Sequence, residues 1–287
     1  MFPHLQIGLI KRSIPVFASL LFLPEVGGLF LLPSWAIPPA ETDRIAQQPE
    51  TPSSNPQREA AQQASTQAEE LFQQGTAESR RQAIAKYQEA LQQWRELNDT
   101  KQTALTLQSI GLIYYSLGEK QQALEYYNQA LSLNRSLNNT AGEAILLMSV
   151  GGVYSDLGEN QKAIESFNQA LSLFRRLGNR DLEARTLTEI AEAYSVLGDL
   201  QSSVNFFNQA LVIQRESKDV AGEAQTLQIL GRTYLSLGEN QKALDSLNQA
   251  LSLFQTVGDA SERGLTLALI GLLYNSQGTR SPIEVSL

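Results

Sequence analysis

A period of 40 residues runs through most of this sequence and constrains its fold more than any other feature. Five tyrosines stand 40 residues apart, from Tyr114 to Tyr274, and four glycines keep the same interval from Gly118 to Gly238. Ala-Leu pairs recur at the same spacing, from Ala90-Leu91 to Ala250-Leu251. A period of this length indicates a stack of similar structural units, each of which contacts its neighbours.

Each period contains two amphipathic helices separated by a glycine turn. Apolar residues on either side of Gly118 recur at steps of three and four, which is the spacing of one face of an α-helix. Gly118 permits the left-handed turn that ends the first helix, and Asp99 stands where a side-chain oxygen caps the start of that helix. The two stripes of one period are Ala104, Leu107, Gly111, Tyr114 and Leu117, followed by Ala123, Tyr127, Ala130, Asn134 and Leu137.

The period divides the chain into five helical hairpins and one further helix. The first hairpin is the least regular, because its segment from Gly75 to Ser79 does not align with the others without a shift. The lone last helix is interpreted as a cap, since terminal repeats present a polar outer face. We expect hairpins at about residues 59–98, 99–138, 139–178, 179–218 and 219–258, a terminal helix at 259–278 and a tail at 279–287.

This pattern resembles the tetratricopeptide repeat, in its long-helix variant of about forty residues. The resemblance implies an all-α fold, a right-handed superhelical array of antiparallel helical hairpins. The chain also resembles the repeat region that precedes a caspase-like domain in some cyanobacterial proteins, but it has no cysteine for such a domain. The residues that carry the resemblance in the second hairpin are Leu107, Ile110, Gly111, Tyr114, Ala123, Tyr127 and Ala130.

In this family the first helix of each hairpin lines the concave surface, which implies candidate ligand-binding positions. Residues at these positions differ from one period to the next, whereas the packing residues barely change. A specific binding groove would give this pattern, and so would drift on an unconstrained surface. The candidate groove residues are Gln108, Leu112, Tyr115, Met148, Asp156, Thr188, Glu192, Gln228, Arg232 and Leu235.

The composition excludes several classes of function. The chain has no cysteine, and its one histidine is His4, so it has no residues for a Cys or His metal site or for a catalytic triad that uses histidine. Its formal net charge of -8 makes nucleic acid a poor partner. Glu189 and Glu192 lie one helical turn apart but are interpreted as solvated charges. We therefore expect no enzymatic activity, no metal and no cofactor.

The first forty residues match a secretory signal peptide. Lys11 and Arg12 precede two apolar runs, at residues 14–23 and 26–32, and Ser34 and Ala36 flank a suitable cleavage point. We expect a signal peptide at residues 1–40, a flexible linker at 41–58 and export to the periplasm or the extracellular space. A membrane anchor is the alternative, although prolines and glycines interrupt the apolar stretch that a span requires. After cleavage no integral membrane span is expected.

These features favour a non-catalytic scaffold that binds a protein or peptide through the concave surface of the array. Preorganised hairpins would fix that surface, so a ligand would be ordered without reordering the receptor. Two alternatives stay open. The chain could assemble with copies of itself through its terminal helix, or it could be a regulatory subunit or a remnant of a system that joins such repeats to a protease.

Overall fold

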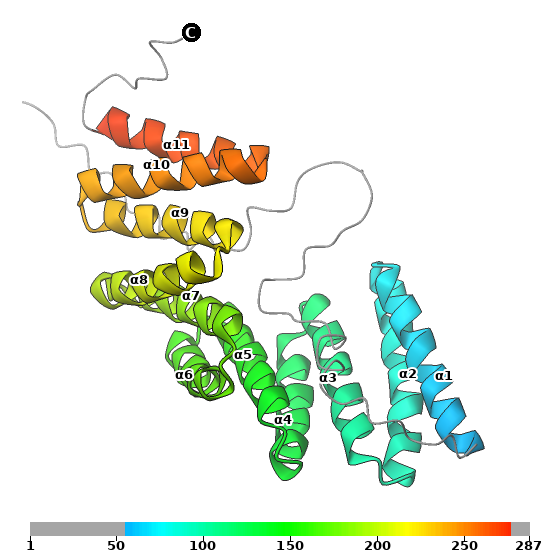
Figure 1. Cartoon of the computed structure of the whole chain (residues 1–287). Coiled ribbons are helices and arrows are strands. Elements are labelled where there is room, and N and C mark those ends of the chain that lie inside the picture. The colour runs from blue at the N-terminus through cyan, green and yellow to red at the C-terminus, as the bar shows by residue number, and fades with distance from the viewer. Residues whose placement is uncertain (1–54, 277–287) are drawn as a thin grey trace, which may run out of the picture. The chain divides into compact units, whose positions relative to one another are not determined.

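In the computed structural model, residues 55–276 are described and form eleven α-helices joined by turns of two or three residues (Figure 1). This part of the chain contains no β-strand. The helices are α1 (Pro56–Gln73), α2 (Ala77–Glu96), α3 (Thr100–Ser116), α4 (Lys120–Ser136), α5 (Thr140–Asp156), α6 (Asn160–Leu177), α7 (Arg180–Leu197), α8 (Leu200–Ser217), α9 (Val220–Ser236), α10 (Asn240–Val257) and α11 (Ala260–Ser276).

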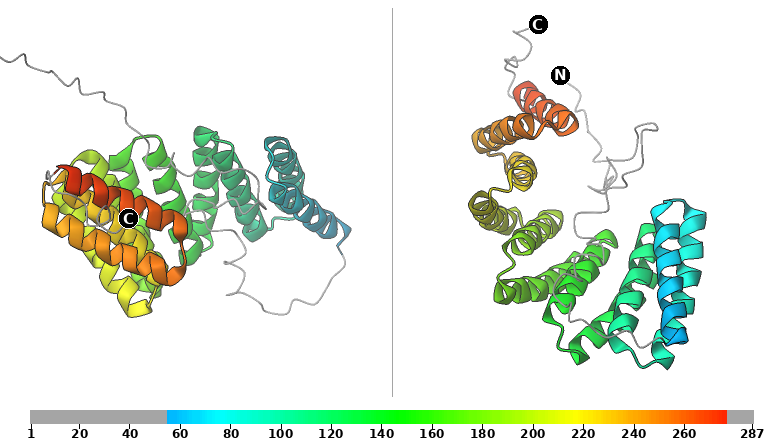
Figure 2. Two further views of the ribbon diagram at one scale, coloured as in Figure 1. Left: turned by 90° about the horizontal axis from the view of Figure 1, so that it is seen from above. Right: turned by 45° about the vertical axis from the view of Figure 1, so that its right-hand side comes forward.

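Successive helices pack as antiparallel pairs, which confirms the predicted all-α array of hairpins. We call the odd-numbered helices A helices and the even-numbered helices B helices. Each A helix from α1 to α9 packs along the B helix that follows it, and each B helix packs on the A helix of the next hairpin. Figure 2 shows the hairpins following one another in chain order. The last A helix, α11, packs on α10 and has no B helix of its own among the described residues.

The start of the array differs from the expected boundary. The helix α1 begins at Pro56, within the segment predicted to be a flexible linker at 41–58. Asn55 explains the earlier start, because its side-chain oxygen accepts a hydrogen bond from the Gln57 amide at 3.0 Å, and proline is well suited to the first position of a helix. The predicted signal peptide (1–40), the rest of the linker and the tail (279–287) lie outside the described residues.

The two helices of a hairpin approach closely at a small residue. Gly111, Gly151 and Gly231 of A helices face Tyr127, Phe167 and Leu247 of the following B helices. A β-carbon added at Gly151 would lie 2.6 Å from a ring carbon of Phe167, which is closer than such contacts allow. Since Phe167 is fully buried, its side chain contributes roughly 2–3 kcal/mol of transfer free energy to the hairpin.

The predicted caps are present at the starts of the A helices. Asp99, Asn139, Asn179, Asp219 and Asp259 each accept a hydrogen bond from the backbone amide three residues ahead, at 2.9–3.2 Å. Each bond satisfies one of the amides that a helix start leaves without a partner, and each cap stabilises its helix by about 1 kcal/mol.

A series of arginines joins one hairpin to the next on the side of the B helices. The Nε atom of Arg135 lies 2.8 Å from Glu143 at the start of the next A helix. The same pair is formed by Arg175 with Glu183 at 2.9 Å and by Arg215 with Glu223 at 2.6 Å. Because exposed ion pairs contribute only about 0–1 kcal/mol each, their main effect is on the register between hairpins.

No helix within residues 55–276 combines the length and the apolar character that crossing a membrane requires. The helix α5 is the most apolar of the array, and its residues from Ala144 to Val153 are all buried. A helix that is apolar all round is covered on every side. In this array, α5 is covered by α6 of its own hairpin, by the preceding B helix α4 and, to a smaller extent, by the neighbouring A helix α7.

The close approach within the hairpins predicts opposite effects of one substitution at two equivalent glycines. Gly151→Ala is expected to lower the free energy of unfolding by about 1–3 kcal/mol, because the new methyl group overlaps Phe167. Gly271→Ala, 120 residues later in α11, meets nothing within 4 Å and should gain up to about 1 kcal/mol of helix propensity. Urea unfolding followed by circular dichroism measures both, and equal destabilisation would contradict the packing account.

Lys218 ends α8 in the left-handed conformation, with φ at 59°, where Gly178 and Gly258 stand at the ends of α6 and α10. An L-residue other than glycine pays about 1–2 kcal/mol in this conformation. Lys218→Gly is therefore expected to raise the free energy of unfolding by about 1 kcal/mol in the same urea experiment. Asn98→Gly is the matched control and should gain less, because asparagine tolerates this conformation better. No gain at Lys218 would show that its conformation is unstrained.

Candidate functional site

The candidate groove residues separate into a buried and an accessible group. Gln108, Leu112, Met148 and Gln228 are buried, with exposed fractions of 4%, 6%, 0% and 9%. They do not face solvent, which corrects the expectation that all ten side chains line an open groove. The remaining six are half-buried or exposed, and we call the surface that they form on the A helices the A-helix surface: Tyr115, Asp156, Thr188, Glu192, Arg232 and Leu235.

Lateral contact between neighbouring A helices buries two of these positions. Met148 accepts a hydrogen bond from the Thr186 hydroxyl of the next A helix, with 3.5 Å between sulfur and oxygen. Gln228 donates through Nε2 to Thr266 at 2.9 Å and to Glu262 at 3.0 Å, both in α11. Met148 and Gln228 therefore each join two adjacent A helices. The long apolar run of α5 was the sequence signal for this contact.

Tyr115 and Asp156 form a polar bridge between α3 and α5. The Tyr115 hydroxyl donates to the Asp156 carboxylate at 2.5 Å. Lys120, at the start of α4, donates to the Asp156 carbonyl oxygen at 2.6 Å and lies 4.0 Å from its carboxylate. Burial and then the hydrogen bond to Asp156 raise the pKa of the Tyr115 hydroxyl, so Tyr115 stays protonated as the donor. This end of the A-helix surface is held together by its own groups.

The centre of the A-helix surface carries two carboxyl groups on one helix and an arginine on the next. Glu189 is buried and Glu192 is half-buried on α7, and Arg232 is exposed on α9. Burial, followed by the charge of Glu189, raises the pKa of Glu192 from 4.5 to about 8, although the charge of Arg232 acts in the opposite direction. The side chains of Glu192 and Arg232 make no hydrogen bond and no ion pair within 4 Å with the described residues, whereas the Arg232 carbonyl oxygen accepts a hydrogen bond from Ser236.

Apolar side chains continue this surface along the later A helices. Leu235 is half-buried on α9, and Leu265 and Leu272 on α11 are 48% and 65% exposed. Leu272 stands 40 residues after Arg232 and 80 after Glu192, so it occupies the equivalent position in its helix. The accessible surface thus changes from acidic at α7, through basic at α9, to apolar at α11.

Two pockets of the array lie away from the carboxyl groups at the centre of the A-helix surface. The pocket lined by Arg95 and Gln129 and the pocket lined by Gln57 and Glu96 include neither Glu189 nor Glu192. Among residues 55–276 no three His, Cys, Asp or Glu side chains are grouped to hold a metal ion. What the surface presents is a set of unlike polar and apolar groups on a rigid helical support.

Comparison with known proteins supports this architecture. A family model of the tetratricopeptide repeat matches residues 77–136, 142–216 and 183–256. No curated protein matches the sequence.

Solved structures share the fold at low sequence identity. BtubC (BKLC) from P. vanneervenii is 20% identical, with a TM-score of 0.60 over 72% of this chain and 94% of that one. The apo form of RapI is 20% identical, with a TM-score of 0.69 over 75% and 77%. Aspartyl phosphate phosphatase F from Bacillus subtilis is 18% identical, with a TM-score of 0.69 over 82% and 63%.

The matched residues extend from α2 to α10 and include the glycines, tyrosines and alanines that close each hairpin. The family match, the 40-residue period and the packing of the hairpins all indicate the same repeat. The chain belongs to the tetratricopeptide-repeat family.

Proposed function

We propose that this protein is a non-catalytic scaffold that binds a protein or peptide through its A-helix surface. Membership of the tetratricopeptide-repeat family supports a role in protein interaction. The choice of surface rests on one observation, which is that the side chains of Glu192 and Arg232 have no hydrogen-bond or ion-pair partner in the array. The two residues lie on adjacent A helices, and neither side chain makes a hydrogen bond or an ion pair within 4 Å among residues 55–276.

The opposite side of the array gives the contrast. Arg135, Arg175 and Arg215 of the B helices are each paired with a glutamate of the next hairpin at 2.6–2.9 Å. These three arginines therefore serve the array itself. A half-buried carboxyl group without a partner is costly, and a ligand that supplies one removes that cost. This favours Glu192 as a contact residue.

The chemistry of the surface describes the partner that fits it. Burial and the charge of Glu189 raise the pKa of Glu192, and in its protonated form the carboxyl group can donate one hydrogen bond and accept others. Arg232 suits a carboxylate of the partner, and Leu235 and Leu272 suit apolar side chains. The matching ligand is a mixed polar and apolar peptide segment that lies across α7, α9 and α11. The segment at residues 1–40 supports the further proposal that the protein acts after export.

Self-assembly is a second candidate function, favoured by α11. Leu272 is 65% exposed, and no atom of the described residues lies within 4 Å of a β-carbon placed at Gly271. A second chain placed against α11 would cover this helix. Light scattering over a range of concentrations separates the two functions, because a scaffold for another protein keeps the mass of one chain. A regulatory role beside a separate protease would instead appear as co-purification with a hydrolase.

The proposed binding surface predicts the effect of reversing its two charges. In a crosslinking pull-down from the exported fraction, Glu192→Lys combined with Arg232→Glu is expected to lose the partner that the native chain captures. The matched control is Glu165→Lys with Arg176→Glu, which exchanges the same residue types at exposed positions of the B helix α6. Both variants should keep their helical circular dichroism. Equal capture by both variants would remove the A-helix surface as the binding site.

The pKa of Glu192 predicts how the stability of the array depends on pH. Because this pKa is raised above its value in the unfolded chain, the folded protein holds a proton between about pH 4.5 and 8 that the unfolded chain releases. The free energy of unfolding should therefore fall as pH rises through this range. Glu192→Gln is expected to remove this fall and to raise the free energy of unfolding at pH 8 above that of the native chain.

Urea unfolding at several pH values measures this dependence. Glu165→Gln, at an exposed position of α6, serves as the control and should follow the pH profile of the native chain. A profile for Glu192→Gln that runs parallel to that of the native chain would show that Glu192 titrates normally.

A further inference from the structure

The arginines that join the hairpins include one without its glutamate. Arginine recurs near the end of the B helices α2, α4, α6 and α8, at Arg95, Arg135, Arg175 and Arg215. The last three each pair with a glutamate eight residues later. Eight residues after Arg95 the sequence has Thr103, whose hydroxyl donates instead to the Asp99 carbonyl oxygen at 2.8 Å. The carboxylate that completes the other three pairs is therefore missing here.

Arg95 finds no substitute among the described residues. Within residues 55–276 its guanidinium makes one hydrogen bond, a long one to the side-chain oxygen of Gln129 at 3.5 Å. The nearby carboxylates are engaged elsewhere: Asp99 pairs with Arg58 at 2.9 Å, and Glu96 accepts a hydrogen bond from Gln57 at 2.6 Å. The guanidinium of Arg95 thus keeps most of its five donors for a further partner.

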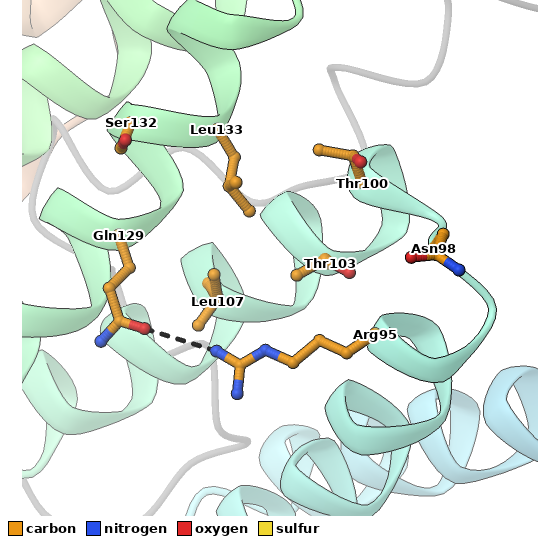
Figure 3. A pocket seen from close by; sticks show the side chains of 8 residues that line it. All are labelled: Arg95, Asn98, Thr100, Thr103, Leu107, Gln129, Ser132 and Leu133. Atoms are coloured by element: carbon orange, nitrogen blue, oxygen red, sulfur yellow. Dashed lines mark hydrogen bonds between the residues drawn. The ribbon is translucent and has the colours of Figure 1, made fainter.

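A pocket of about 400 Å³ lies beside this arginine, between α2, α3 and α4 (Figure 3). Figure 3 shows Arg95 reaching toward Gln129 along one side of the pocket, with Thr103 and Leu107 of α3 on another. Seven of the eight lining residues have the same type 40 residues later in the chain, and the exception is Thr103, which corresponds to Glu143. The pocket lies at the junction between the first and second hairpins. It therefore has the same residues as the junction between the second and third hairpins, except that a threonine replaces the glutamate.

We propose that this pocket binds the side-chain carboxylate of a glutamate from a partner protein, which takes the place of the missing internal glutamate. The guanidinium of Arg95 recognises the carboxylate, since its planar set of donors matches two carboxylate oxygens. Leu107 and Leu133 provide apolar contacts for the stem of the glutamate, and the Gln129 amide and Ser132 hydroxyl lie at the rim as further donors. The geometry of the pair Arg135 and Glu143 shows that a glutamate fits such a junction. This site lies on the side of the B helices and is independent of the A-helix surface.

The test uses a capped glutamate, N-acetylglutamate N-methylamide, as the probe and the full chain labelled with nitrogen-15. The side-chain Nε–H signal of Arg95, assigned by its loss in Arg95→Gln, is followed by nuclear magnetic resonance at constant ionic strength. It should shift with a dissociation constant on the order of millimolar, because one exposed ion pair contributes little free energy. Capped glutamine, which has no charge, should produce no shift.

Two exchanges between the junctions complete the test. Thr103→Glu restores the internal partner, so the affinity of Arg95 for the probe should fall at least tenfold. Glu143→Thr makes the next junction a copy of the pocket, so the Arg135 signal should begin to shift with the same probe. Each variant introduces the residue type that the equivalent position of the other junction already has. The proposal would be overturned if the Arg95 signal did not shift with the probe, or if it shifted with the same affinity in Thr103→Glu.

Discussion

The contact between a glycine of one helix and an aromatic or leucine side chain of its partner is the interaction on which the rest of this structure depends. At Gly151 and Phe167 the two helices of a hairpin are close enough that even a methyl group would overlap the ring. Because a hairpin of two helices cannot bury its apolar faces alone, it is stable only when stacked on another. Repetition of the same contact along the chain gives each hairpin the same geometry.

This regular packing leaves two sides with different uses. On the side of the B helices, arginine and glutamate pair across the junctions and fix the register of the stack. On the side of the A helices, the junctions are made by side chains such as Met148 and Gln228, and the positions beyond them vary in charge and size. The arginine–glutamate pairs that join the hairpins and the proposed contact residues Glu192 and Arg232 are therefore different residues.

Most of the fold could be predicted from the sequence because its determinants are local and repeated. Steps of three and four residues predicted the helices, and the capping role expected at Asp99 and its equivalents is confirmed. The start of α1 was placed late, because the linker-like composition around it concealed the cap at Asn55 and the proline after it. Lys218 adopts the left-handed conformation although nothing in its type favours it, so the packed helices around it determine its backbone.

The candidate site was predicted less well, since it depends on contacts between residues about 40 positions apart. Burial of Met148 and Gln228 follows from their contacts with the neighbouring A helix, and a single period does not encode such contacts. The pocket at Arg95 could not be predicted from the sequence for a similar reason. The importance of Thr103 becomes clear only from the structure, in which Glu143, Glu183 and Glu223 at the equivalent positions each pair with an arginine.

The central claim is that a partner lies on the side of the A helices, and photocrosslinking from single positions tests it most directly. A photoreactive amino acid placed at Thr188, which is half-buried on α7, should give an adduct with one partner protein in the exported fraction. The same group at Asn168, which is exposed on the B helix α6, should give none. An adduct from Asn168 and none from Thr188 would contradict the account and place the partner on the other side of the array.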